Sequence, residues 1–323
     1  MKTSTSFQPI DIIIISYNTS ILTTKCVQSI YDTTKDNISI TVVDNNSTDD
    51  TIPSLQRNYS RVKIIQNKRN LGYAAAINIG MQQTLSEYII VSNTDVIFHR
   101  NTINNLIDYM HTHAKVGAVG PQQLYADGSW QRSYGSTPGI SSAVKHLLGV
   151  TFIVHFINKF FWPLIKNIKI DKSVGYIDGA VIGFKRSAFK SIGGFDDAFF
   201  FFGEDADFCQ RLKKAGWKVM TLPIAQVIHL RGGSFTSIDS VFNKKRSQML
   251  IDAKKKMVKK RYSSWMIDLY ILVEKTYFWK MELFYYILVS LTKGQLKNKC
   301  ILKHKIFRFN KQAWDEEKSG QTE

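Results

Sequence analysis

The alternation of apolar runs with mixed stretches over about the first 130 residues most constrains what this chain can fold into. The segment Asp11–Ser16 is an almost continuous apolar run, which is typical of a strand buried on both faces. Strands separated by helix-length segments predict a parallel sheet with helices on both faces, so the fold class is α/β. The expected strands of this part are Asp11–Ser16, Ile38–Val43, Val62–Gln66 and Glu87–Val91.

Helices are expected between and after these strands, at Thr19–Tyr31, Gly72–Leu85 and Asn101–His111. A further helix is expected after the second strand, with Ser47 or Asp49 as its cap and Pro53 in its first turn. The second half of the chain continues the pattern less regularly. It predicts a strand at Tyr176–Phe184, a helix at Arg186–Ile192, a helix that opens at Glu204 and stops at Gly216, and strands at Trp217–Leu222 and Val227–Leu230.

Polar clusters follow three of the expected strands, namely SYN at 16–18, DNNS at 44–47 and SNTD at 92–95. In open α/β sheets, ligands bind beyond the carboxyl ends of the strands, so the three clusters mark one edge of the sheet as a candidate site. No GxGxxG motif follows the first strand and no GxxxxGK[ST] motif is present. Classical dinucleotide and P-loop sites are therefore not expected.

Asp95 is a candidate ligand for a hard divalent cation, which could in turn hold a diphosphate, although a turn or helix cap is the ordinary role of such a residue. Asp44 has two similar interpretations, an Asx turn or a hydrogen bond to a ligand N–H. His229 near a later strand end is either a structural histidine or a metal ligand beside Asp95.

Three acids, Glu204, Asp205 and Asp207, open a helix within the stretch GGFDDAFFFFGEDAD. Carboxylates in the first turn ordinarily interact with the helix dipole. The apolar residues around them, however, would raise the pKa of a carboxyl group and make it a better general base. The cluster is therefore a candidate for acid–base chemistry.

The net charge of +17 is concentrated near the C-terminus, because residues 241–323 hold 19 Lys+Arg against 8 Asp+Glu. Nine cations lie within residues 244–261. Such a basic tail indicates an anionic partner, either nucleic acid or an anionic membrane, whereas a solvated helix face would need none. The three widely spaced cysteines, Cys26, Cys209 and Cys300, fit a reducing compartment and suggest no zinc site.

Two apolar segments, 147–165 and 265–291, are interrupted by polar residues, and neither is a clean span of about 20 apolar residues. Each fits either a buried core helix or an interfacial helix, in which Trp, Tyr and Lys anchor an apolar face at a membrane. The N-terminus lacks the pattern of a signal peptide.

Six short motifs stand in order over roughly residues 10–235: IIISYN, VVDNNSTDDT, NLGYAAAIN, VSNTDV, GAVIGFKRSAFKSIGGFDDAFFFFGEDADFCQRLKKAGW and VIHLRGGS. Their order resembles glycosyltransferase family 2, and most of all its rhamnosyltransferase-like and galactofuranosyltransferase-like branch of bacterial surface-polysaccharide enzymes. The resemblance implies the GT-A fold, with a mostly parallel central sheet. It further implies a catalytic domain over 1–240, with a nucleotide-sugar half at about 1–130 and an acceptor half at about 131–240, followed by a basic helical extension over 241–323.

The resemblance also implies a nucleotide-sugar site at the strand ends. Tyr17 matches the residue that packs on the nucleobase, and Asp44 matches the acid that pairs with the base N–H. Asn93 replaces the first acid of the DxD position, which leaves Asp95 as the main metal and diphosphate contact. The implied donor-binding set is Ser16, Tyr17, Asn18, Asp44, Asn46, Asn70, Gly72, Asn93, Thr94 and Asp95.

The same resemblance assigns the catalytic base to Asp205, with Glu204 beside it. His229 matches a histidine that completes a metal site with Asp95, so the implied cofactor is Mg²⁺ or Mn²⁺. The residues expected to line the acceptor and donor pocket are Asp178, Gly179 and Phe202.

The implied reaction is an inverting hexosyl transfer, in which Asp205 takes the proton of an acceptor hydroxyl and the nucleotide diphosphate leaves. The expected donor is dTDP-rhamnose, with UDP-galactofuranose, UDP-glucose and other UDP-hexoses left open. A polyprenyl-diphosphate-linked saccharide is the expected acceptor, on the cytoplasmic face of the bacterial inner membrane. The basic tail would contact anionic lipid, with roughly 1 kcal/mol per cation, and no nucleic-acid partner is expected.

Two other classes of protein share part of this pattern. A catalytically silent, membrane-associated binding protein would keep the fold, but the acids at Asp44, Asp95 and Asp205 argue against it. A nucleotidyltransferase would have a glycine-rich basic phosphate loop near the N-terminus, and SYNTS at 16–20 is not one.

Overall fold

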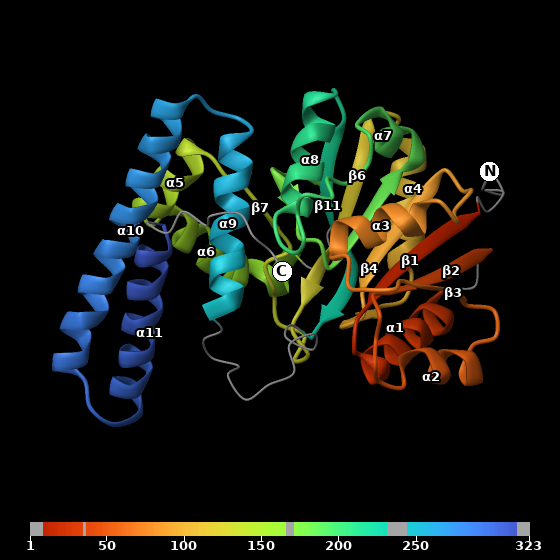
Figure 1. The fold of residues 1–323 in the computed structure, drawn as a ribbon, viewed down its shortest axis with the longest axis horizontal. Helices are drawn as coiled ribbons and strands as arrows, with labels where there is room; N and C mark the ends of the chain where they lie inside the picture. The colour runs from red at the N-terminus through yellow and green to blue at the C-terminus, as the bar shows by residue number, and fades with distance from the viewer. Residues whose placement is uncertain (1–8, 35–36, 166–170, 231–243, 315–323) are drawn as a thin grey trace. The chain divides into compact units, whose positions relative to one another are not determined.

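The computed structural model describes residues 9–34, 37–165, 171–230 and 244–314 (Figure 1). The RGGS part of the last motif and the expected domain boundary near residue 240 lie outside these ranges. The chain divides into two compact units. The first unit is Met1–Thr137 with His155–Thr236, and the second unit is Pro138–Val154 with Ser237–Glu323.

The first unit alternates strands and helices, as its sequence pattern predicts. Its strands are β1 (Ile10–Ser16), β2 (Ile38–Asp44), β3 (Lys63–Gln66), β4 (Tyr88–Asn93), β5 (Val96–Phe98), β6 (Val116–Leu124), β7 (Tyr134–Gly135), β8 (Lys172–Ser173), β9 (Tyr176–Ile177), β10 (Val181–Lys185) and β11 (Lys218–His229). Its helices are α1 (Ser20–Thr33), α2 (Thr51–Asn58), α3 (Tyr73–Met81), α4 (Thr102–Thr112), α7 (Arg186–Ser191) and α8 (Glu204–Lys214).

A nine-stranded sheet forms the centre of the first unit, in the order β3-β2-β1-β4-β10-β6-β11-β5 with β8 paired to β11. Strands β1, β2, β3, β4, β6 and β11 run in one direction, and β5, β8 and β10 run in the other. The expected α/β class with a mostly parallel sheet is confirmed. The register pairs Ser16 with Asp44 and Ile15 with Asn93, so the polar ends of β1, β2 and β4 share one edge.

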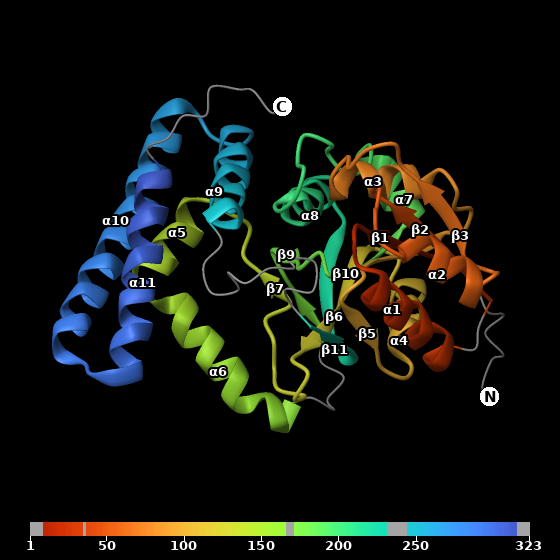
Figure 2. The same ribbon diagram turned by 60° about the horizontal axis from the view of Figure 1, so that its bottom comes forward.

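Alternate residues of β1 enter two separate cores. Ile12 and Ile14 pack with side chains of α1, α2 and α4, whereas Ile13 and Ile15 pack with those of α3, α7 and α8. Because successive side chains of a strand point to opposite faces, a continuous run of isoleucines fills both. The helices therefore cover both faces of the sheet, as Figure 2 shows for this unit.

The second half of this unit departs from the expected elements. The single strand expected at Tyr176–Phe184 is two strands, β9 and β10, separated by Asp178–Ala180. The two strands expected at Trp217–Leu222 and Val227–Leu230 are one strand, β11, with an irregular register between Leu222 and Gln226. Strand β6 has no counterpart among the expected elements.

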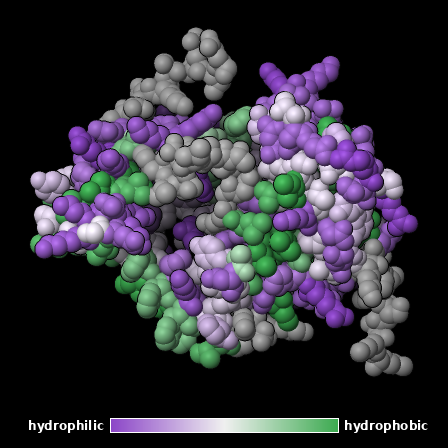
Figure 3. Space-filling model, turned by 90° about the horizontal axis from the view of Figure 1, so that it is seen from below, coloured by the Kyte–Doolittle hydropathy of each residue, from purple (hydrophilic) through white to green (hydrophobic). Residues whose placement is uncertain are grey.

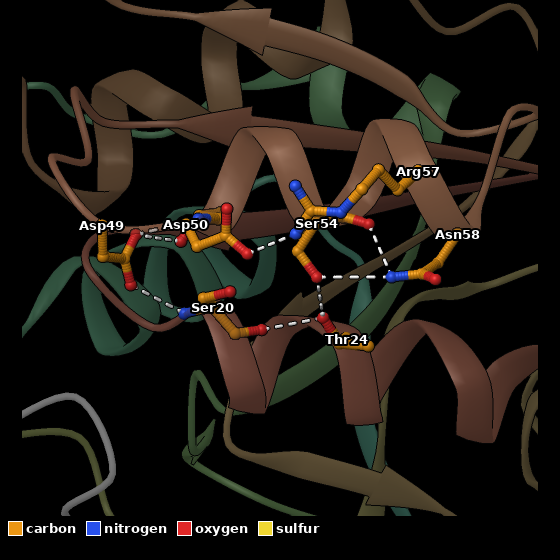
Figure 4. A network of polar contacts seen from close by, with 8 residues as sticks. Ser20, Thr24, Asp49, Asp50, Ser54, Arg57 and Asn58 are labelled. Carbon is orange, nitrogen blue, oxygen red and sulfur yellow. Dashed lines mark hydrogen bonds and ion pairs between the residues drawn. The ribbon is translucent and has the colours of Figure 1, made fainter.

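Polar contacts tie the start of α1 to the start of α2 (Figure 4). The Asp49 carboxylate accepts hydrogen bonds from the backbone N–H of Ser20 at 2.9 Å and of Thr51 at 3.1 Å. One side chain thus satisfies a free N–H at the start of both helices. The hydroxyl groups of Thr24 and Ser54 lie 3.3 Å apart and join the two helices one turn further on.

The second unit consists of α5 (Ile140–Leu147), α9 (Lys244–Lys259), α10 (Ser264–Leu291) and α11 (Gly294–Ala313). Helices α10 and α11 lie side by side as a helical hairpin (Figure 1). A separate apolar core holds this unit together. Its buried residues are Ala143, Ile251, Val258, Tyr270, Phe278, Ala313 and Trp314.

Two lysines of the basic segment 244–261 make hydrogen bonds within the second unit. Lys254 Nζ lies 3.1 and 3.0 Å from the carboxylate oxygens of Glu274, which also accepts the hydroxyl of Tyr270 at 3.0 Å. Lys255 Nζ donates to the carbonyl of Ala313 at 3.0 Å. These two cations therefore stabilise the helical unit itself, and they are poor candidates for the expected anionic contact.

Helix α6 (Val150–Ile165) is shared, since its residues to Val154 belong to the second unit and those from His155 to the first. Trp162 packs with Leu124 and Trp130. Most of the other apolar side chains of α6 are exposed: Val150, Phe152, Ile153, Val154, Phe156, Ile157, Phe160, Phe161 and Leu164. Figure 3 shows hydrophobic side chains, in green, exposed in patches on one face of the molecule.

Among the described residues, no single helix combines the length and hydropathy needed to cross a bilayer, and Ile140–Leu147 with Val150–Leu164 reaches that threshold only as a pair bent by 76°. The end of the α10–α11 hairpin also exposes apolar side chains. They are Tyr286, Ile287, Leu291 and Leu296, with exposed Lys293, Lys297 and Lys299 beside them.

Candidate functional site

The ends of β1 and β2 are joined by their polar residues. The backbone N–H of Asn45 donates to the carbonyl of Ser16 at 2.8 Å, and that of Thr48 donates to Asn18 Oδ1 at 2.8 Å. Tyr17, between them, leaves 45% of its surface exposed. An exposed ring on a well-held turn suits stacking on a planar ligand. Asn46 also lies exposed on this edge, with φ of 68°.

Asp44 closes an Asx turn. Its fully buried carboxylate accepts the backbone N–H of Ser47 at 2.8 Å and the Ser47 hydroxyl at 2.5 Å. The Asx turn, which is the ordinary role of such an aspartate, is thus present in the structure. Contact with a nucleobase remains a prediction.

Gly72 lies where the loop after β3 meets the segment before α8. Its φ is +85°, and an added Cβ would lie 2.4 Å from the carbonyl oxygen of Phe200, so no side chain fits. The backbone N–H of Tyr73 donates to the same carbonyl at 2.8 Å. Asn70 Oδ1 accepts the N–H of Gly72 at 2.9 Å. The close approach that this glycine permits is therefore to the backbone of Phe200.

Asp95 and His229 meet at the far side of the same edge. His229 Nε2 lies 3.4 Å from Asp95 Oδ1, and both residues are buried. The His229 Nδ1 lies 2.8 Å from Gln123 Oε1, which can only accept, so the Nδ1 carries the proton. In neutral His229, the Nε2 then presents a lone pair toward Asp95.

These two side chains fit a divalent cation. Asp95 Oδ1 is buried and has no hydrogen-bond partner among the residues that the structure describes. A carboxylate oxygen and an imidazole nitrogen are both metal ligands, and the amide of Gln123 orients the imidazole as an outer-shell group does. In the described part of the chain, no group of three or more His, Cys, Asp or Glu residues could hold a metal. Asn93 ends β4, and Thr94 and Asp95 form the connection to β5.

Asp205 is held at the first turn of α8. Its Oδ2 accepts the backbone N–H of Gly179 at 2.9 Å, and its Oδ1 accepts that of Ala206 at 2.7 Å. The hydroxyl of Tyr73 donates to the carbonyl of Gly179 at 2.8 Å. The segment between β9 and β10, which contains Asp178 and Gly179, thus holds the Asp205 carboxylate through the N–H of Gly179.

Burial and neighbouring acids change the protonation of this group. Burial, and then the charge of Asp178, raise the pKa of Asp205 to about 7. Burial raises the pKa of Glu204 well above its usual range, and the charges of Asp205 and Asp178 add to the shift. Burial, followed by the charges of Glu204 and Asp205, also raises the pKa of Tyr73. The expectation that apolar surroundings favour a base at Asp205 agrees with these directions.

The backbone before α8 is strained, because Phe202 is a non-glycine residue with φ of 70° and Gly203 follows with φ of 88°. This turn ends the aromatic segment and starts the helix at Glu204. Glu204 Oε2 is buried without a hydrogen-bond partner in the described part of the chain. Strain and an unsatisfied carboxyl oxygen at one turn are typical of functional sites.

Three residues near this site were not predicted from the sequence. Tyr73 directly follows Gly72 in the NLGY motif, so the motif itself carried a usable signal. Gln123 lies on β6, which was not expected to be a strand. Arg132 lies just before β7, and its Nη2 donates to the hydroxyl of Tyr176 at 2.8 Å.

Comparisons with known proteins identify the family of the chain. A family model described as glycosyl transferase family 2 matches residues 11–193, and one described as the N-terminal domain of galactosyltransferase matches residues 165–232. N-acetylglucosaminyl-diphospho-decaprenol L-rhamnosyltransferase of Mycobacterium tuberculosis is 30% identical over 218 residues, which are 61% of this chain and 68% of that protein. Glycosyltransferase GlyG of Streptococcus pneumoniae is 31% identical over 126 residues, 38% of this chain and 42% of that protein.

Solved structures show the same fold. A mannosyltransferase from Pyrobaculum calidifontis, in complex with GDP-Man and Mn²⁺, has a TM-score of 0.60 at 15% identity, covering 97% of this chain and 89% of that one. GalNAc-T7, with UDP, GalNAc and Mn²⁺, has a TM-score of 0.56 at 15% identity, covering 79% and 51%. Because the family model spans more than half of the chain, the chain belongs to glycosyltransferase family 2 and is a glycosyltransferase with the GT-A fold.

Proposed function

We propose that the protein transfers L-rhamnose from dTDP-rhamnose to a hydroxyl of a lipid-diphosphate-linked N-acetylglucosamine, with inversion, during the synthesis of a bacterial surface polysaccharide. One observation carries the chemistry: Asp205 is fixed by the backbone of Gly179 and Ala206, with a pKa raised to about 7. The 30% identical mycobacterial relative, an N-acetylglucosaminyl-diphospho-decaprenol L-rhamnosyltransferase, supports both the sugar and the acceptor class.

Asp205 is the proposed general base. A carboxyl group with a pKa of about 7 is about half ionised at neutral pH, and it takes up a proton more readily than an ordinary aspartate does. Each carboxylate oxygen accepts one backbone N–H and keeps a lone pair for the acceptor hydroxyl. The deprotonated hydroxyl oxygen bonds to the anomeric carbon as the bond to the diphosphate breaks, so the configuration inverts without a covalent enzyme intermediate.

The donor is proposed to lie along the strand ends, with its base on Tyr17 near Asp44 and its diphosphate near Asp95. When bound by Asp95 and His229, a Mg²⁺ or Mn²⁺ ion would offset the charge of the leaving diphosphate. The two structural neighbours were solved with Mn²⁺. Asn70 and Gly72 hold the loop beside the donor, whereas Asp178, Gly179 and Phe202 shape the acceptor side.

The chain is proposed to act as a peripheral protein on the cytoplasmic face of the inner membrane. The proposed division places donor binding in about 1–130, acceptor binding in about 131–240 and membrane contact mainly in 241–323. Exposed aromatic and aliphatic side chains on α6, and the lysine-flanked end of the α10–α11 hairpin, support this role. The segment 138–165 contains no acidic residue, which favours an anionic lipid surface.

A transfer assay tests the function. The full chain is incubated with Mn²⁺, a prenyl-diphosphate-linked N-acetylglucosamine and, in turn, dTDP-rhamnose, UDP-galactofuranose and UDP-glucose. The expected product carries one deoxyhexose, is formed from dTDP-rhamnose alone, and has the anomeric configuration opposite to that of the donor. A product only from a UDP-sugar would overturn the rhamnose assignment, and a retained configuration would overturn the inverting mechanism.

Flotation with phosphatidylglycerol vesicles tests the membrane role. Replacing Leu291 and Leu296 with Ser removes two exposed apolar side chains, each of which would contribute roughly 1.5–3 kcal/mol if fully buried in lipid. We expect the bound fraction to fall at least about tenfold. The matched control replaces Ile21 and Leu85, which are 72% and 94% exposed on the first unit. Equal binding by the two double variants would contradict the proposed contact.

A further inference from the structure

A two-stranded ribbon leads directly into the base-bearing site. Strands β7 and β9 pair antiparallel, with Tyr134 opposite Ile177, and the N–H of Asp178 donates to the carbonyl of Ser133 at 2.9 Å. The next residue, Gly179, holds the Asp205 carboxylate. The side chains of this ribbon therefore stand beside the place where the acceptor hydroxyl would be deprotonated.

Two phenols of the ribbon contact two cations, Arg132 just before β7 and Lys172 on β8. Arg132 Nη2 donates to the hydroxyl oxygen of Tyr176 at 2.8 Å, and Arg132 Nε donates to the carbonyl of Tyr134 at 3.2 Å. Lys172 Nζ donates to the Tyr134 hydroxyl oxygen at 3.3 Å and lies 4.8 Å from the centre of that ring. Because both phenol oxygens accept from cations, each phenol can use its own hydrogen to donate to an anion.

The guanidinium group of Arg132 is coupled electrostatically to the acids of the site. Its pKa is raised first by Tyr176, and then by the carboxylates of Asp178 and Asp205. An arginine that is fixed at two donors, and whose fork is charged at every working pH, suits a phosphate group.

We propose that Arg132, together with Lys172 and the Tyr176 hydroxyl, binds the diphosphate of the lipid-linked acceptor. The inference rests on the proposed function, because it takes the acceptor to be a sugar on a lipid diphosphate. The sugar whose hydroxyl faces Asp205 carries that diphosphate at its other end. A cationic ribbon that starts at the residue holding the base is placed to receive it, while Asp95 and His229 attend to the donor diphosphate.

Steady-state kinetics with two acceptors test the proposal. One acceptor is N-acetylglucosamine on a short prenyl diphosphate, and the other is octyl N-acetylglucosaminide, which has no phosphate. Arg132→Gln should raise KM for the first acceptor by about tenfold or more, since a charge-assisted hydrogen bond is lost. It should leave KM for the second acceptor and for the donor within about twofold. Arg100→Gln, which removes the same charge from an exposed arginine before α4, is the matched control.

Three results would overturn the proposal: equal losses with both acceptors, a raised KM for the donor, or no change. If the wild type glycosylates neither acceptor, the proposed function fails, and the diphosphate site is judged by calorimetry with geranyl diphosphate at saturating dTDP. Binding that is about tenfold weaker in Arg132→Gln supports the site, whereas equal binding refutes it. Flotation of Arg132→Gln with phosphatidylglycerol vesicles should match the wild type, and a loss there would assign Arg132 to lipid headgroups instead.

Discussion

Glu204 and Glu274 are both buried glutamates, one in each unit, but the partners of their carboxyl groups differ. Glu274 accepts from Lys254 and from Tyr270, so its charge is compensated. Glu204 has an oxygen without a partner in the described residues, two neighbouring acids and a pKa raised well above its usual range. A buried carboxylate that is paired with a cation or hydrogen-bond donors is typical of a structural role. Unpaired buried carboxyl groups that lie close together are typical of functional sites. The acids around Glu204 therefore lower the stability of the first unit, whereas the Lys254–Glu274 pair contributes to the packing of the second unit.

The sharpest separation between the two units should come from Asp205→Asn. Loss of a general base lowers transfer by roughly 10²–10⁴-fold, while nucleotide binding stays within about twofold. The variant should also be more stable than the wild type at pH 8, by roughly 1–3 kcal/mol, because a raised carboxyl pKa makes folding less favourable as pH rises from about 4 to 7. Product formation and thermal melting measure the two effects. Asp127→Asn, an exposed acid, is the control, and normal transfer by Asp205→Asn would remove the base assignment.

The reverse outcome is expected for Glu274→Ala. This change leaves the Lys254 ammonium without its buried partner and should destabilise the second unit by roughly 3–5 kcal/mol. Hydrogen exchange should accelerate in α9, α10 and α11, while transfer to a soluble octyl acceptor stays within about twofold. Replacing both partners, as Lys254→Met with Glu274→Leu, should recover most of the loss. A double variant as unstable as the single one would show that the pair is not the cause.

Gln123→Met tests whether the geometry around His229 serves a metal. Without the amide oxygen at 2.8 Å, the Nδ1 proton is no longer fixed, and the affinity for Mn²⁺ should fall by roughly 10–100-fold. Titration of activity with Mn²⁺ should show normal rates at high metal. An equal loss at every Mn²⁺ concentration would point to a structural role for Gln123.

The smallest effect concerns pH. Since the pKa of Asp205 is raised to about 7, kcat/KM should rise about tenfold per pH unit below this value and level off above it. Binding to vesicles should show no such step, because the exposed cations of the hairpin end are lysines. A rate that is flat between pH 5.5 and 8 would contradict the raised pKa.

Much of the fold of residues 1–130, the proposed nucleotide half, could be predicted from sequence. Strands β1, β2 and β4 are dominated by apolar residues, and each ends in a polar cluster, so their positions and their common edge follow from hydrophobicity alone. Asp205 could be proposed as a candidate base because aromatic residues crowd the start of its helix, and this role stays a prediction. The positions of Asp44, Asp95 and His229 also agree with the expected edge.

Three features elsewhere were harder to predict for physical reasons, namely β6, the break between β9 and β10, and the Lys254–Glu274 pair. Strand β6 contains glycines, Pro121 and two buried glutamines, a composition that resembles a loop although the strand is buried throughout. The break at Asp178–Ala180 is invisible in the apolar pattern, yet it supplies the N–H that holds Asp205. Similarly, Lys254 reads as one cation of a run, and only the fold reveals Glu274 beside it. Contacts between residues distant in sequence decide each of these cases.

The contact of Gly72 with Phe200 has a consequence for how the sequence can change over time. Any side chain at position 72 would collide with a carbonyl that also accepts the N–H of Tyr73, in the segment immediately before the strained turn at Phe202. A substitution in one segment therefore displaces the backbone of the other, so neither sequence can change independently. In homologues or in directed evolution, substitutions at position 72 should survive only together with changes in 200–203, so the two segments are inherited as a pair.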